Sequence, residues 1–121
     1  ALKKFRDIML ETKDYGFARL SEAQWELGGK VRAHLAARGI KSVAADGFGA
    51  PGVVVSYTSD PGVQNGSKFA AEGLQIAAGV PLMCDEPEGY STFRLGLFGL
   101  DKLMDVDGAV ARLDAALDKV L

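Results

Sequence analysis

An arginine inside an apolar run has the clearest chemical potential in this chain. Arg94 is the second residue of Phe-Arg-Leu-Gly-Leu, positions 93–97. Because side chains alternate between the two faces of a strand, the three apolar residues should face helices, leaving Arg94 and Gly96 on the other face. A planar guanidinium beside a glycine suits bidentate binding of a carboxylate. The alternative is a solvated arginine, paired with Asp85 or Glu86 and contributing little to stability.

Other reactive side chains lack the partners that a catalytic or metal site needs. His34 is the single histidine and has no second ligand at a zinc-site spacing, so a partly buried structural role is expected. Cys84 has no local signature of an activated thiolate. The candidate serine nucleophiles have no elbow motif, and one histidine leaves little room for a triad: Ser56, Ser59 and Ser67. We therefore expect no catalytic residue and no metal site in this chain.

Glycine pairs and an acidic loop also favour structural explanations. Gly47-Phe48-Gly49 is not followed by the helix start that a dinucleotide fingerprint requires. The stretch 96–99, Gly-Leu-Phe-Gly, follows a strand, but no helix is expected to open directly after it and it lacks the Lys-Ser/Thr pair of a phosphate-binding loop. The acidic segment Asp85–Glu88 does not have the regular ligand spacing of a calcium loop. These segments are interpreted as turns and a solvated loop, and no cofactor-binding residue is predicted.

Length and composition indicate one globular domain, residues 1–121, because single cores commonly form at about 100–150 residues. A net charge of −2 without a basic stripe argues against nucleic acid as a partner. No apolar run approaches the ~20 residues that cross a bilayer, so no membrane association is expected. The single Cys84 suits a reducing compartment, which favours a cytoplasmic location.

Hydrophobic periodicity predicts an alternation of helices and short strands. The expected helices are Leu2–Tyr15, Phe17–Arg38, a weak one over Asp60–Glu72 interrupted at Gly66, and one from Val106 to Val120. The expected strands are Ile40–Ala45, Val53–Tyr57, Leu74–Ala78 and Thr92–Phe98. This order predicts an α/β fold, a two-layer sandwich whose small, mostly antiparallel sheet carries helices on one face.

Several local signals set the ends and buried faces of these helices. Asp60 and Asp105 are expected N-caps, and Gly39 is expected to end the second helix. The second helix could start at a capping box formed by Ser21 and Gln24, but an unbroken start at Phe17 is favoured. Its predicted buried stripe is Trp25, Gly28, Val31, Arg32 and Leu35. The last helix should bury Val106, Val110, Leu113, Leu117 and Val120.

The stretch 93–99, Phe-Arg-Leu-Gly-Leu-Phe-Gly, followed by a terminal helix from Val106, resembles a known family. It is similar to the C-terminal end of class V pyridoxal-phosphate-dependent aminotransferases, which include alanine–glyoxylate and serine–glyoxylate aminotransferases. That family typically has Arg-Ile-Gly-x-x-Gly here, where this chain has Leu95 in place of isoleucine. The upstream elements follow the same order, so the resemblance covers essentially the whole chain. It implies the C-terminal small domain of a fold-type-I enzyme.

The resemblance also implies a role for Arg94 and a list of missing parts. The matching arginine binds the α-carboxylate of an amino acid or of a 2-oxo acid such as glyoxylate or pyruvate. Pyridoxal 5′-phosphate would be bound mainly by a large domain that this chain lacks, in an enzyme that is usually a homodimer. In the family a lysine of the large domain binds the cofactor, and no lysine of this chain has the matching sequence context. This applies to Lys3, Lys13, Lys30, Lys41, Lys68, Lys102 and Lys119. The isolated chain is therefore not expected to be active.

Two further hypotheses about the function of this sequence remain open. A cysteine desulfurase or another class V enzyme would use a reactive cysteine in a mobile loop, and Cys84 does lie in the expected loop Gly79–Ser91. A stand-alone domain that binds an amino acid, or that mediates oligomerisation, would need no catalytic residue. The start at Ala1 within an amphipathic pattern fits either removal of an initiator methionine or a domain boundary.

Overall fold

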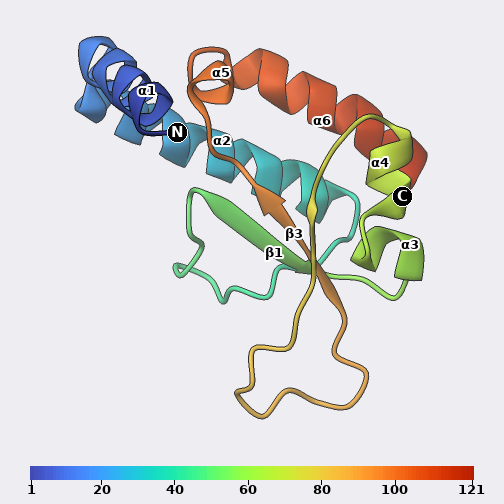
Figure 1. Cartoon of the computed structure of the whole chain (residues 1–121). Coiled ribbons are helices and arrows are strands. Elements are labelled where there is room, and N and C mark those ends of the chain that lie inside the picture. The colour runs from blue at the N-terminus through green and yellow to red at the C-terminus, as the bar shows by residue number, and fades with distance from the viewer.

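The computed structural model describes all residues from Ala1 to Leu121 and contains six helices and three strands. Figure 1 shows them in chain order. Their bounds are α1 Leu2–Tyr15, α2 Phe17–Ala37, β1 Val53–Tyr57, α3 Pro61–Gln64, α4 Ser67–Ala71, β2 Ala77–Ala78, β3 Thr92–Gly96, α5 Leu100–Leu103 and α6 Val106–Val120. No helix is long and apolar enough to cross a bilayer.

The three strands form one antiparallel sheet in the order β1-β3-β2. In this register the central residue Arg94 lies opposite Val55 of β1 and Ala77 of β2. The predicted alternation along β3 is confirmed. Phe93 and Leu95 in the strand and Leu97 directly after it are buried, with exposed fractions of 0%, 4% and 5%. One face of the sheet is therefore covered, and the other carries Arg94.

The helices supply the second layer, which completes the predicted two-layer α/β sandwich. One apolar cluster joins the covered face of the sheet to helices α2, α3, α4 and α6. Phe69 of α4 packs against Phe93 at a ring-centroid distance of 5.7 Å, and Leu117 of α6 is fully buried. Burial of each such side chain stabilises the fold by about 1.5–3 kcal/mol.

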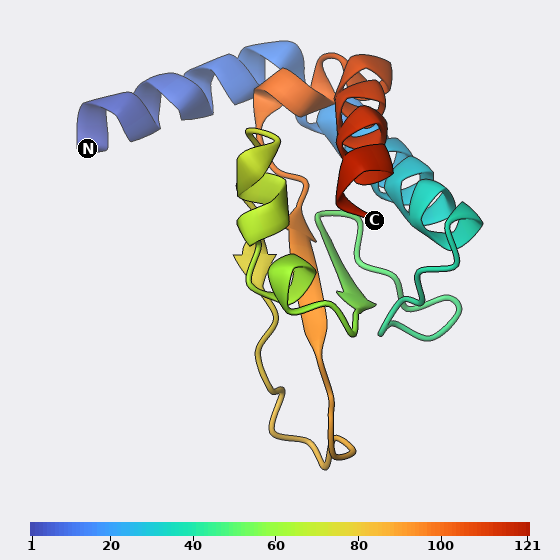
Figure 2. The same ribbon diagram turned by 90° about the vertical axis from the view of Figure 1, so that its right-hand side faces the viewer.

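Helix α1 stands apart from this core. Figure 2 shows it extending away from the rest of the molecule. None of its residues is buried, and its apolar stripe, which includes Phe5, Ile8 and Met9, is exposed. Its contacts are with α2, which follows it directly after Gly16.

Three expected strands are shorter than the pattern predicts. The strand expected over Thr92–Phe98 ends at Gly96. The segment Ile40–Ala45 forms only one isolated bridge, between Ser42 and Ser56. Two backbone hydrogen bonds make this bridge, from the Val43 N–H to the Val55 carbonyl oxygen and from the Tyr57 N–H to the Lys41 carbonyl oxygen, and a turn closed by the Phe48 N–H on the Ala45 carbonyl oxygen follows. The strand expected over Leu74–Ala78 is reduced to Ala77–Ala78, since the Leu74 N–H bonds the Phe69 carbonyl oxygen and so closes helix α4 instead.

The helical predictions hold at most positions. Asp60 caps α3, Asp105 caps α6, and the weak helix is split at Gly66, whose φ is +81°. The unbroken start of α2 at Phe17 and the positive φ of Gly39 beyond its end are confirmed. The expectation that no helix opens directly after the stretch 96–99 is wrong, because the short helix α5 begins at Leu100 with Gly99 as its N-cap residue.

The predicted stripe of α2 is wrong at two positions. Trp25 is 60% exposed and Arg32 is only half-buried, whereas Gly28, Val31 and Leu35 are buried. Gln24 lies on the covered side of α2 instead, because its side-chain amide donates hydrogen bonds to the backbone carbonyl oxygens of Pro51 and Leu97. A polar residue with partners can occupy a face that hydrophobicity alone assigns to tryptophan.

Candidate functional site

Arg94 lies at the centre of the open face of the sheet. Its neighbours there are small or aliphatic: Val55 on β1, Ala77 on β2 and Gly96 two residues along β3. Gly96 leaves space beside it, and the ring of Phe98 bounds that space, since a methyl group at Gly96 would lie 3.5 Å from the ring. Arg94 as a residue is half-buried among small and aliphatic neighbours, while its hydrogen bond with Ala78 lies at the solvent-exposed surface of the sheet.

The hydrogen bonds of Arg94 orient its guanidinium. Its Nε donates to the Ala78 carbonyl oxygen at 3.0 Å. Arg94 belongs to none of the ion pairs of the molecule, so its two terminal nitrogens have no protein acceptor. The expected alternative, a pair with Asp85 or Glu86, is not formed. A rigid fork with two unsatisfied donor groups is the arrangement that binds a carboxylate bidentately.

Glu86 has a different role, inside its own loop. Its carboxylate accepts hydrogen bonds from the backbone N–H groups of Leu82 and Cys84. Backbone N–H groups, its own first, hold the pKa of the Glu86 carboxyl below its usual range. The loop contains two non-glycine residues with positive φ, Met83 and Asp85, so the carboxylate compensates part of the backbone strain.

His34 joins two helices. Its Nδ1 lies 2.5 Å from Asp114 Oδ1 on α6, and Arg38 of α2 also contacts this carboxylate, at 2.8 Å. The contact with His34, followed by that with Arg38, lowers the pKa of the Asp114 carboxyl. The expected structural role of His34 agrees with this position.

The other residues singled out in the sequence are not brought together. Cys84 is exposed in the loop between β2 and β3, which Figure 1 shows projecting from the end of the sheet. Ser56 is buried in β1, and the Ser67 hydroxyl bonds the Gly62 carbonyl oxygen. Gly47 and Gly99 have positive φ values of +83° and +111°, as turn glycines do.

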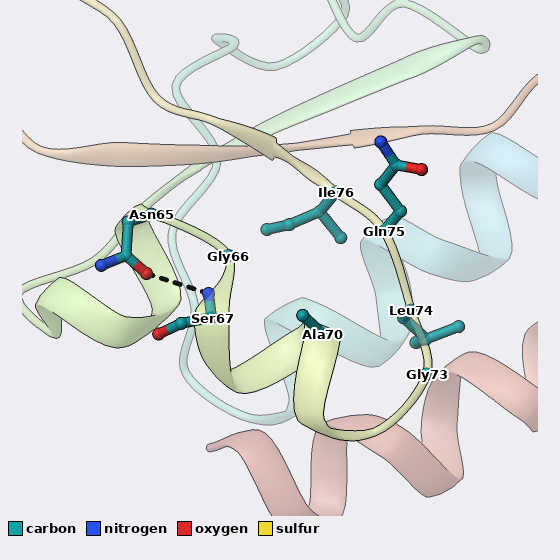
Figure 3. A pocket seen from close by; sticks show the side chains of 8 residues that line it. All are labelled: Asn65, Gly66, Ser67, Ala70, Gly73, Leu74, Gln75 and Ile76. Carbon is teal, nitrogen blue, oxygen red and sulfur yellow. Dashed lines mark hydrogen bonds between the residues drawn. The ribbon is translucent and has the colours of Figure 1, made fainter.

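A shallow hollow lies between the α3–α4 turn and the segment that leads into β2 (Figure 3). It is lined by Asn65, Gly66, Ser67, Ala70, Gly73, Leu74, Gln75 and Ile76. No lining side chain is charged, and the Asn65 Oδ1 already accepts a hydrogen bond from the Ser67 N–H at 2.9 Å. The hollow therefore offers little chemistry, in contrast to the guanidinium of Arg94.

The sequence interpretation missed two residues near Arg94. Gln64, the last residue of α3, donates its side-chain amide to the Gly79 carbonyl oxygen at 3.1 Å. Gly79 follows the residue whose carbonyl oxygen holds Arg94. The only available signal was a glycine directly after a short strand, which usually marks a turn or a close backbone approach.

Comparisons with known proteins give one kind of match. No family model and no curated protein matches this chain. Among solved structures, it is similar to the crystal structure of ureidoglycine-glyoxylate aminotransferase from Bacillus subtilis, with a TM-score of 0.58 and 20% sequence identity. The match covers 92% of this chain but 28% of that chain, in a C-terminal part.

The likeness shows that this chain shares the fold of the matched C-terminal part of that structure. It confirms, at the level of the fold, the resemblance drawn from residues 93–99 and the terminal helix. The chain spans about 28% of the length of the structure that it matches.

Proposed function

We propose that this chain is the small domain of a pyridoxal-phosphate-dependent aminotransferase, in which Arg94 binds the α-carboxylate of the substrate. The observation that carries the proposal is the guanidinium on the open face, anchored through Nε and without a carboxylate partner. The shared fold supports the enzyme class.

An arginine in this position suits both halves of an amino-transfer reaction. The amino donor and the 2-oxo acceptor, such as glyoxylate or pyruvate, share a carboxylate next to the reacting carbon. One bidentate arginine can therefore orient both substrates, and such positioning lowers the barrier by several kcal/mol. In the proposed enzyme the small domain closes the active site and brings Arg94 to the substrate.

The cofactor does not fit the residues of this chain. Pyridoxal phosphate needs a lysine amine for its aldehyde, but no lysine of this chain stands in the context of the family's cofactor lysine, and several are held in ion pairs. Lys30 pairs with Glu26 and Asp107, Lys68 with Asp60, and Lys119 with Glu72. We therefore assign cofactor binding to a large domain outside this chain, in a homodimeric enzyme.

The test is Arg94→Ala in the enzyme that contains this domain together with the large domain. For carboxylate substrates kcat/KM should fall by roughly 10²–10³-fold, the usual cost of removing one member of a desolvated charge pair. The absorption spectrum of the bound cofactor should not change. Arg112→Ala is the matched control, because Arg112 is an exposed arginine of α6. A kcat/KM unchanged by Arg94→Ala would exclude the proposed role.

A second candidate is a stand-alone module that binds an amino acid or mediates oligomerisation. The exposed apolar stripe of α1 favours it, because such a stripe commonly marks an interface. Calorimetry and sedimentation of the 121-residue chain distinguish the two candidates. Binding of a specific amino acid without any cofactor, or a stable oligomer of this chain alone, would favour the module.

A further inference from the structure

We propose that Gln64 and Gly79 are positioning residues for Arg94, acting through the peptide group between Ala78 and Gly79. The inference deepens the proposed function and rests on it, because it explains how the carboxylate-binding guanidinium is held. Neither residue contacts the guanidinium directly. Gln64 bonds Gly79, and Gly79 follows Ala78, whose carbonyl oxygen accepts the hydrogen bond from Arg94 Nε.

Gln64 is itself held in place by the start of its helix. The Asp60 side chain accepts hydrogen bonds from the N–H groups of Gly62, at 2.7 Å, and Val63, at 3.2 Å. Val63 is buried in the core, so the short helix is fixed at its start and along its inner face. The Gln64 side chain therefore starts from a backbone with little freedom.

Two hydrogen bonds of opposite direction join Gln64 to Gly79. The Gln64 side-chain Nε2 donates to the Gly79 carbonyl oxygen at 3.1 Å. The Gly79 N–H donates to the Gln64 backbone carbonyl oxygen at 3.4 Å. The pair fixes both ends of residue 79 against α3, since a single bond would leave the segment free to rotate about it.

Gly79 is needed for space. A methyl group there would lie 1.8 Å from the carbonyl oxygen of Thr92 and 2.4 Å from its hydroxyl oxygen. Thr92 is buried and belongs to the central strand, so it cannot retreat. Any side chain at position 79 would push the end of β2 away from β3 and change the distance between Ala78 and Arg94.

The hydrogen bonds form a continuous path from α3 to the guanidinium. The Ala78–Gly79 peptide group receives the Arg94 Nε–H on its oxygen and gives its N–H to Gln64. Because a guanidinium is planar and rigid, a fixed Nε direction also restricts the direction of the two terminal nitrogens. The path places the carboxylate-binding fork before any ligand arrives.

The contacts around the hollow of Figure 3 stabilise the same junction. A methyl group at Gly66 would lie 3.1 Å from Ile76 Cγ1, so the α3–α4 turn contacts the chain directly before β2. Ile76 also packs against the core cluster. The segment 76–79 is therefore tied to α3 and α4 at both of its ends.

The experiment is nitrogen-15 NMR on the 121-residue chain, in which the Arg94 Nε–H gives a side-chain signal. In the wild type this proton should exchange with water about tenfold more slowly than that of the exposed Arg112, as expected for one retained hydrogen bond. Gln64→Met and Gln64→Glu should both abolish this difference, because each removes the side-chain amide that bonds the Gly79 carbonyl oxygen. Only the 3.4 Å bond from the Gly79 N–H to the Gln64 backbone carbonyl oxygen then remains, and by itself it does not fix residue 79. Gly79→Ala should do the same where the variant folds.

Matched controls separate positioning from general destabilisation. Gln75→Glu makes the same chemical change at an exposed glutamine that forms no side-chain hydrogen bond, and Gly29→Ala adds a methyl group where nothing lies within 4 Å. Both should leave the Arg94 proton protected. If that proton stays protected in the Gln64→Met variant, the proposal is overturned. An effect of Gln64→Glu alone would overturn it too, because it would indicate charge.

A titration with acetate separates this proposal from the proposed function. Acetate should shift the Arg94 signals in the wild type, with a dissociation constant that rises about tenfold in Gln64→Met, the cost of about one hydrogen bond. If acetate does not affect the wild-type signals, the carboxylate role of Arg94 fails, whereas the exchange measurement still decides on the Gln64 contact. If acetate binds equally well to the wild type and to Gln64→Met, the positioning role is overturned.

Discussion

Helices α1 and α6 resemble each other in sequence but not in their environment. They have 14 and 15 residues, and both carry an apolar stripe opposite charged residues. Helix α6 buries Val110, Ala116, Leu117 and Val120, whereas α1 buries no residue. An amphipathic pattern therefore predicts a face that is stable when covered, but it does not identify what covers that face.

The ends and the polar sides of the two helices differ in the same way. Asp105 caps α6 through the Gly108 N–H, while Ala1 offers α1 no side-chain cap. Asp114 ties α6 to α2 through His34 and Arg38. Because isolated helices of this length are marginal in water, α1 depends on its junction with α2 and on its own propensity.

The largest expected effect is in α6. Leu117→Ala should lower the free energy of unfolding by about 2–5 kcal/mol, since it removes a fully buried side chain and leaves a cavity. Urea unfolding followed by circular dichroism measures the change. Leu10→Ala on α1 is the control with the same chemistry at an exposed position. Similar losses in both variants would contradict the contrast between the helices.

An intermediate effect should depend on pH. The folded state lowers the pKa of Asp114, so its contribution to stability is present above its unfolded pKa of about 3.9 and is lost as pH falls through the folded value. The wild type should thus exceed Asp114→Asn in stability at neutral pH, with a difference that shrinks below about pH 4.

Urea unfolding at a series of pH values measures this dependence. Asp14→Asn is the control on α1, because Asp14 forms no ion pair. A stability difference for Asp114→Asn that stays constant down to acid pH would show that this carboxylate does not link α6 to α2.

The smallest expected effect is in α1. Ile8→Ala should change the free energy of unfolding by no more than about 0.5 kcal/mol, because the side chain is exposed and alanine favours helix. The same urea measurement applies. A loss as large as that of Leu117→Ala would mean that α1 is covered in solution, for example by a second copy of this chain. Sedimentation would then show an oligomer.

Much of the fold could be predicted because its signals are local. The two aspartate caps, the split at Gly66 and the alternation that directs Arg94 to the open face act over one to four residues. The error in the buried stripe of α2 arose where distant partners decide which side chain is covered. Gln24 and not Trp25 lies on the covered side of α2, because the two hydrogen-bond acceptors of Gln24 lie at residues 51 and 97.

The candidate site divides in the same manner. Local sequence is enough to place Arg94 on a strand face with Gly96, since side chains alternate between the two faces at every residue of a strand. Contacts between distant parts of the fold determine that the guanidinium pairs with no acid, that the Gln64 side chain bonds the Gly79 carbonyl oxygen, and that α1 stays uncovered. Those features depend on contacts between residues 15 or more positions apart, and no local rule specifies where the chain brings them together.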